Sequence, residues 1–183
     1  GLITNLRQRM AWFPPENFSC PELSKDISFT KMAKSKAAIS AELSYDAHLV
    51  SKDYIGYPDL DNLDNRIALE KAVFDGLYGP IVEPASLFIR YKGKTIGSCL
   101  VLVIKCWGYE EVPWIFDLVI NPEYQGKGFG KKLLYQSLST LIEKKYPIIG
   151  LAVTLSNKNA IKMYENIGFS VVEIFSEYAY KTL

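Results

Sequence analysis

A glycine-rich segment at residues 125–132 (QGKGFGKK) constrains the fold of this 183-residue chain more than any other feature of its sequence. It follows the apolar run at residues 114–120 and precedes a stretch in which apolar residues recur at helical intervals. Three alternating glycines permit backbone angles that are closed to other residues. The segment therefore predicts a strand, a tight turn and a helix in direct succession.

The same segment also has the chemistry of an anion site. The N-terminus of the following helix offers unpaired N–H groups and a partial positive charge, and three lysines lie in or beside the turn. The glycine spacing matches neither a Walker A loop, G-x-x-x-x-G-K-[ST], nor the dinucleotide motif G-x-G-x-x-G. Two interpretations stay open at this point: a phosphate or pyrophosphate site, and a turn that only packs a helix against a sheet.

The hydrophobic periodicity along the chain predicts an α/β fold, or α+β by a stricter definition, because helices and strands are interleaved. Residues 1–27 contain Pro14, Pro15 and Pro21, and are predicted to be an irregular extension draped over a single domain at residues 28–183. Strands are expected at residues 28–33, 86–91, 95–106, 114–120, 148–154, 170–175 and 177–181, and helices at residues 36–50, 65–77, 130–145 and 157–167.

Composition excludes several classes of function. Twenty-one basic and twenty acidic residues give a net charge of +1, so no global field attracts nucleic acid or an anionic membrane. Three scattered cysteines and a single histidine, His48, make a metal site unexpected, and His48 is interpreted as an ordinary helix residue. With neither an apolar span nor a signal peptide in the sequence, we expect a cytoplasmic protein that does not enter a membrane.

A second motif lies in the predicted helix at residues 157–167. Asn157 and Tyr164 are seven residues apart, which places them on one face of the helix and roughly 10 Å apart along its axis. A polar pair directly after a strand end is typical of a functional site. The alternative is that Asn157 only caps the helix and Tyr164 only packs.

Together these two motifs resemble those of the GNAT N-acetyltransferase superfamily. Residues 125–130 are similar to its acetyl-CoA signature, [RQ]-x-x-G-x-[GA], and residues 157–169 to its following motif, N-x-x-A-x-x-x-Y-x-x-x-G-F. The strong resemblance covers residues 113–169, about a third of the chain. It implies a mixed, mostly antiparallel sheet of six to seven strands with a splayed central strand pair and about four helices.

The resemblance also implies how acetyl-CoA would bind. The pyrophosphate would rest on the backbone amides of the glycine-rich loop, and the pantetheine arm would pair with the end of the preceding strand. The side chains of Asn157 and Tyr164 would face the pantetheine and its sulfur. The cofactor-binding residues implied in this way are Leu118, Val119, Ile120, Gln125, Gly126, Lys127, Gly128, Phe129, Gly130, Lys131, Asn157 and Tyr164.

The implied reaction is direct transfer of an acetyl group to a primary amine. Asp117 is the one charge in the apolar run at residues 114–120, and strand alternation predicts that it shares a face with Ile115 and Val119. It is a candidate general base, with a structural or amine-binding role as the alternative. Tyr164 is the implied hydrogen-bond donor to the leaving sulfur.

The acceptor amine is not determined by the sequence, and a small molecule is favoured. The segment at residues 52–64 contains Asp53, Asp59, Asp61, Asp64, Tyr54 and Tyr57, which suit a cationic amine but equally suit a solvated loop. The alternative function is a CoA-binding sensor or scaffold without catalysis. A homodimer through exposed edge strands also stays open.

Overall fold

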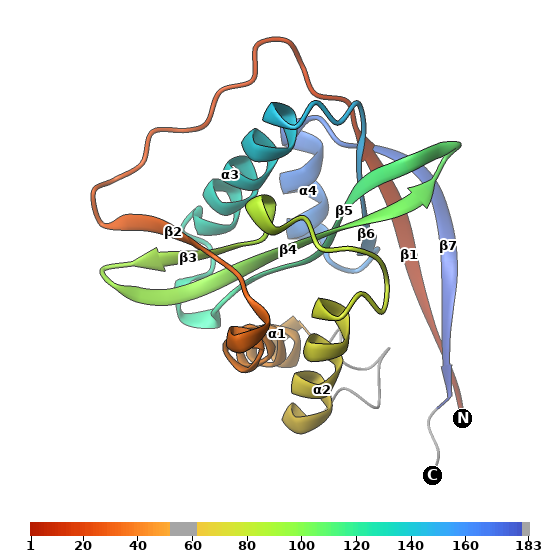
Figure 1. Cartoon of the computed structure of the whole chain (residues 1–183). Helices are drawn as coiled ribbons and strands as arrows, with labels where there is room; N and C mark the ends of the chain where they lie inside the picture. Colours follow the sequence, from red (N-terminus) through yellow and green to blue (C-terminus); the bar gives the residue numbers. More distant parts are fainter. Residues whose placement is uncertain (52–61, 181–183) are drawn as a thin grey trace.

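The computed structural model describes residues 1–51 and 62–180 and consists of one mixed sheet between two layers of helices. The strand order across the sheet is β2-β3-β4-β5-β6-β1-β7. In Figure 1, α1 and α2 cover one face of the sheet, and α3 and α4 cover the other. The predicted α/β class is therefore confirmed.

The described residues contain seven strands and four α-helices, together with three short 3₁₀ turns. The strands are β1 (Leu2–Trp12), β2 (Ile27–Lys31), β3 (Leu87–Tyr91), β4 (Lys94–Cys106), β5 (Tyr109–Ile120), β6 (Ile149–Thr154) and β7 (Ser170–Tyr180). The α-helices are α1 (Ala37–Ser51), α2 (Leu63–Phe74), α3 (Phe129–Glu143) and α4 (Lys158–Ile167); the 3₁₀ turns are η1 (Lys34–Lys36), η4 (Glu83–Ala85) and η5 (Pro122–Tyr124).

A splayed pair of strands lies at the centre of the sheet. β5 and β6 are parallel and pair only through Trp114 with Gly150 and Ile115 with Leu151. The other neighbouring strands are antiparallel. The backbone edge of β5 beyond Ile115 is therefore not paired with β6, and the expected separation of the two central strands is confirmed.

The N-terminal segment corrects the sequence interpretation. Residues 1–27 were expected to drape over the domain, but β1 lies inside the sheet and pairs antiparallel with both β6 and β7. Its last residues, Met10 and Trp12, are buried in the core. The prolines at positions 14, 15 and 21 all follow this strand, so they disrupt only the chain after it.

Two smaller expectations also differ. The two C-terminal strands predicted after residue 169 are one continuous strand, β7, because it pairs along β1 over nearly its whole length. The helix expected at residues 65–77 makes Asp64 its expected cap, but the cap of α2 is Asn62: the Asn62 Oδ1 atom accepts hydrogen bonds from the backbone N–H groups of Asp64 (2.8 Å) and Asn65 (3.3 Å). Asp64 instead lies in the first turn, where its charge suits the helix dipole.

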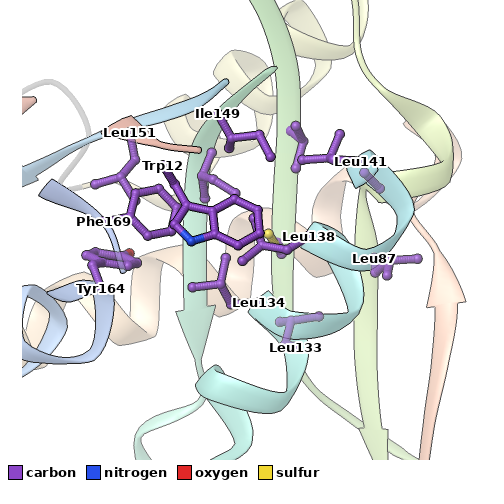
Figure 2. Packing of buried hydrophobic residues seen from close by; sticks show 14 of the residues in the cluster. Trp12, Leu87, Leu133, Leu134, Leu138, Leu141, Ile149, Leu151, Tyr164 and Phe169 are labelled. Carbon is purple, nitrogen blue, oxygen red and sulfur yellow. The ribbon is translucent and has the colours of Figure 1, made fainter. Parts of the chain in front are cut away.

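The core has one layer on each side of the sheet. Successive residues of β4 alternate between them: Val101 packs beneath α3, and Leu100 and Leu102 pack beneath α1 and α2. The apolar run of β4 is therefore covered on both faces. In Figure 2, Trp12 lies between Phe169 and the leucines of α3, which ties β1 to the helical layer.

None of the helices in the described parts of the chain is both long and apolar enough to cross a membrane.

Candidate functional site

A groove of about 850 Å³ opens where β5 separates from β6. Its walls are the end of β5, the loop before α3, the N-terminal turns of α3 and α4, and the last turns of α1. The lining residues are Ala47, His48, Val50, Leu118, Val119, Ile120, Tyr124, Gln125, Gly126, Gly128, Phe129, Gly130, Lys131, Ser156, Asn157, Lys158, Asn159, Ala160, Met163 and Tyr164. Eleven of the twelve residues expected to bind the cofactor line this one groove.

The N-terminus of α3 is open towards the groove. Gly126 and Gly128 have backbone φ angles of +75° and +82°, which residues other than glycine rarely adopt. Gly128 is the N-cap residue and, having no side chain, contributes no capping hydrogen bond; the first turn contains no acidic residue. In contrast, asparagine side chains cap α2 and α4. The first-turn amides of α3 are therefore suited to an anionic group.

The end of β5 supplies the second wall. Leu118, Val119 and Ile120 pair with β4 on one side, and their other edge faces the gap left by β6. The side-chain amide of Gln125 donates a 2.9 Å hydrogen bond to the carbonyl oxygen of Ile120, which ties the loop to the strand end. The groove thus offers backbone groups of an open strand edge to an extended ligand.

The lysines of the loop differ in position. Lys131 lines the groove, with its ammonium group 5.7 Å from the ring centroid of Tyr135. Lys127 lies outside the lining, and its Nζ donates to the carbonyl oxygen of Glu123 at 3.2 Å. A second hollow of about 260 Å³ between α3 and α4 shares Lys131, Asn159 and Met163 with the groove and adds Lys162 and Asn166.

Asn157 and Tyr164 both line the groove. The Asn157 Oδ1 atom accepts a 3.3 Å hydrogen bond from the backbone N–H of Ala160, so this side chain caps α4 as well. Tyr164 is buried, with its ring centroid 5.7 Å from that of Phe169; Figure 2 shows the two rings side by side. Burial raises the pKa of Tyr164, and the nearby Cys99 and Asp117 raise it further. The phenol is therefore a hydrogen-bond donor at neutral pH.

The side chain of Asp117 does not lie on the face of the sheet that strand alternation predicts. A β-bulge at Phe116 shifts the register, so that Ile115 pairs with Val101 while Asp117 pairs with Leu100. Ile115 packs on the α3 side, whereas Leu100 and Val119 pack on the α1 and α2 side. Asp117 therefore shares a face with Val119 but not with Ile115. It lies just beyond the last paired residue of β5 and β6, at the fork between them.

A buried polar seam between α1 and α2 was not anticipated. The Ser40 hydroxyl donates to Glu70, and Arg66 donates to Ser44 at 2.8 Å and to the Nδ1 atom of His48 at 2.9 Å. Burial raises the pKa of Glu70 to about 7; the hydrogen bond from Ser40 and the charge of Arg66 oppose this rise, and the charge of Asp117 adds to it.

The sequence carried a signal for this seam. Ser40, Ser44 and His48 recur every four residues, as do Arg66 and Glu70, so each set forms a polar stripe on a helix that must bury one face. The stripe brings His48, interpreted as an ordinary helix residue, to the rim of the groove. The acidic and aromatic residues expected at positions 53–61 lie outside the described residues.

Comparison with known proteins identifies a family and relatives of the chain. The sequence model of the acetyltransferase (GNAT) family matches residues 57–169. The mycothiol acetyltransferase of Propionibacterium freudenreichii is 26% identical, over 81% of this chain and 53% of that protein. The chain spans about half the length of the curated relatives that it matches over most of its own length.

Solved structures share the fold. A GCN5-related N-acetyltransferase from Sphaerobacter thermophilus has a TM-score of 0.68 at 14% identity, covering 96% of this chain and 51% of that one. An aminoglycoside N-acetyltransferase in complex with CoA has a TM-score of 0.58 at 14% identity, covering 80% of this chain and 90% of the other. At these identities the likeness concerns the fold alone.

Proposed function

The chain belongs to the acetyltransferase (GNAT) family, and we propose that it transfers an acetyl group from acetyl-CoA to a primary amine, with a small-molecule amine as the favoured acceptor. The observation that carries this proposal is one groove that joins three features: the uncapped N-terminus of α3, the open edge of β5 and the buried hydroxyl of Tyr164. A localisation in the cytoplasm is part of the same proposal.

The groove fits acetyl-CoA along its length. The first-turn amides of α3 and the ammonium of Lys131 would hold the pyrophosphate, and the hollow between α3 and α4 adds Lys162 beside it. The amide-bearing pantetheine arm would pair with Leu118–Ile120, as an added strand does. Lys127, which lies outside the groove lining, would contribute charge rather than contact.

The acceptor must lose a proton before it attacks the thioester carbonyl. An alkylammonium with a pKa near 10.4 is deprotonated in only about one molecule in 2,500 at pH 7, a deficit of roughly 4.6 kcal/mol. Asp117 lies at the fork between β5 and β6, where it would bind the ammonium or accept its proton. The new N–C bond forms as the C–S bond breaks, and the electron pair of that bond passes to sulfur.

Tyr164 would stabilise the leaving sulfur. The ordinary pKa of a tyrosine exceeds that of a thiol, so full proton transfer is uphill by about 2 kcal/mol, and burial of Tyr164 increases this gap. A hydrogen bond from the phenol to the developing thiolate carries no such cost. The buried phenol is therefore assigned as a donor that keeps its proton until sulfur becomes negative.

Thermal unfolding with and without CoA or acetyl-CoA tests the binding step, with NADH and ATP as controls. A ligand at 100 times its dissociation constant adds about 2.7 kcal/mol, which raises the midpoint by roughly 5–10 °C for a chain of this size. Tyr164→Phe should retain this shift but lower kcat, whereas Tyr135→Phe, which replaces a tyrosine outside the groove lining, should leave both unchanged.

Two results would contradict the proposal. No midpoint shift at saturating CoA would mean that the glycine-rich loop is only a turn. A shift with the CoA species but no acetylation of any amine would instead indicate a CoA-binding module without catalysis. Loss of CoA binding in Tyr164→Phe, with unchanged turnover per bound complex, would contradict the role given to Tyr164.

A further inference from the structure

Two aromatic side chains are stacked in the open beside the fork of the sheet. Tyr78 follows α2, and Phe116 is the bulged residue of β5; their ring centroids are 5.4 Å apart and their planes differ by 28°. Tyr78 is 50% exposed and Phe116 is 36% exposed. The exposed edges and outer faces of two stacked rings form one continuous apolar surface, and exposed apolar patches on proteins often mark binding sites.

The bulge places this surface next to a carboxylate. Phe116 and Asp117 are consecutive, with Cα atoms about 3.8 Å apart, and the shifted register gives both the face that carries α1 and α2. Tyr78, which stacks on Phe116, leaves α2 on that same face. Leu118, the residue after Asp117, lines the groove, so along β5 Asp117 lies between the bulged Phe116 and the groove. The charge of Asp117 also acts on Glu70 and on Tyr164.

We propose that the stacked pair Tyr78–Phe116 binds the apolar or aromatic part of the acceptor and presents its amine to Asp117. The acceptor class is then a primary monoamine whose ring or alkyl group is joined to nitrogen by a short linker, because Phe116 and Asp117 are neighbours. This inference rests on the proposed acetyltransferase function and specifies its acceptor.

The chemistry of the surface separates this class from other amines. The acceptor's ring would stack on the aromatic pair, and its ammonium group would be attracted both by the negative charge of Asp117 and by the π faces of the rings. A linear polyamine has no apolar group for the pair and carries further charges that must stay hydrated. A very small amine such as methylamine reaches Asp117 without touching either ring.

The test compares three amines and four variants. Initial rates of acetylation are measured for phenethylamine, spermidine and methylamine at saturating acetyl-CoA. The variants are Phe116→Ala, Tyr78→Ala, the ring-retaining Phe116→Tyr, and Leu77→Ala as the matched control; Leu77 is 56% exposed and adjacent to Tyr78. Calorimetry of phenethylamine binding to the CoA complex provides a measurement that does not depend on turnover.

The proposal predicts that phenethylamine has the highest kcat/KM of the three amines. Each alanine variant should lower the kcat/KM for phenethylamine roughly 2- to 10-fold, which corresponds to the loss of one aromatic–aromatic contact. The change should appear as a higher KM and not as a lower kcat. Phe116→Tyr, which keeps a ring at this position, should recover most of the kcat/KM that Phe116→Ala loses, and Leu77→Ala should match the wild type. The kcat/KM for methylamine should be the same in the wild type and in every variant. Calorimetry should show the same weakening.

Equal phenethylamine kinetics in wild type, Phe116→Ala and Tyr78→Ala would overturn the proposal, as would a preference for spermidine. A CoA complex that neither binds nor acetylates phenethylamine would overturn it as well, while acetylation of another amine would leave the proposed function intact. A folded protein that binds no CoA at all overturns the proposed function, and this inference with it.

Discussion

Replacing Glu70 by glutamine removes a buried carboxyl group whose ionisation opposes folding. Glu70 is 7% exposed, and burial is the main cause of the rise in its pKa from the ordinary value of 4.5 to about 7. Glutamine retains the shape and an oxygen that can accept the hydrogen bond from Ser40, but it does not titrate. The variant therefore isolates the effect of this one proton.

The sign and size of the effect follow from linkage. Below pH 4.5 the carboxyl is protonated in both folded and unfolded chains, and its contribution to stability is fully present. Between pH 4.5 and about 7 the folded chain keeps the proton that the unfolded chain has released, so the free energy of unfolding falls as pH rises. Each unit of pKa corresponds to about 1.4 kcal/mol, so the total loss is on the order of 3 kcal/mol.

Urea unfolding followed by tryptophan fluorescence between pH 4.5 and 8.5 measures this loss. The stability of wild type relative to Glu70→Gln should fall by about 3 kcal/mol across that range, with most of the change complete by about pH 7. Glu42→Gln, at an exposed position on α1, is the matched control and should follow the wild-type pH dependence. Parallel pH profiles for wild type and Glu70→Gln would refute the reasoning.

Two further substitutions test local features of the fold by urea unfolding. In Gly150→Ala the new Cβ atom would lie 2.5 Å from the Trp114 ring and 2.9 Å from the Trp107 ring. Because both rings are rigid, we expect the free energy of unfolding to fall by about 1–3 kcal/mol. An unchanged urea midpoint would show that the rings move freely. Asn62→Ala removes the side-chain cap of α2 and should lower the free energy of unfolding by about 1 kcal/mol, while Lys71→Ala, at an exposed position of the same helix, should lower it less; equal losses would contradict the assignment of the cap.

The site was predictable where its residues are close in the sequence. The glycine-rich turn, the helix after it and the pair Asn157 and Tyr164 each depend on spacing within one or two helical turns, and the structure places them around one groove. The same local logic identified most strands and helices to within a few residues. It failed at Asp117, because the bulge at Phe116 depends on pairing with β4 and not on the residues of β5 alone.

The sequence by itself determined the α/β class, the glycine-rich turn and the motif of the following helix, since each is encoded by residue types at short spacing. Only the tertiary structure decided that β1 completes the sheet between β6 and β7, because strand pairing joins residues as distant as Arg7 and Thr154. It also decided the raised pKa of Glu70 and the exposure of the Tyr78–Phe116 pair. Burial and register depend on which elements meet across the fold, and no local pattern specifies that.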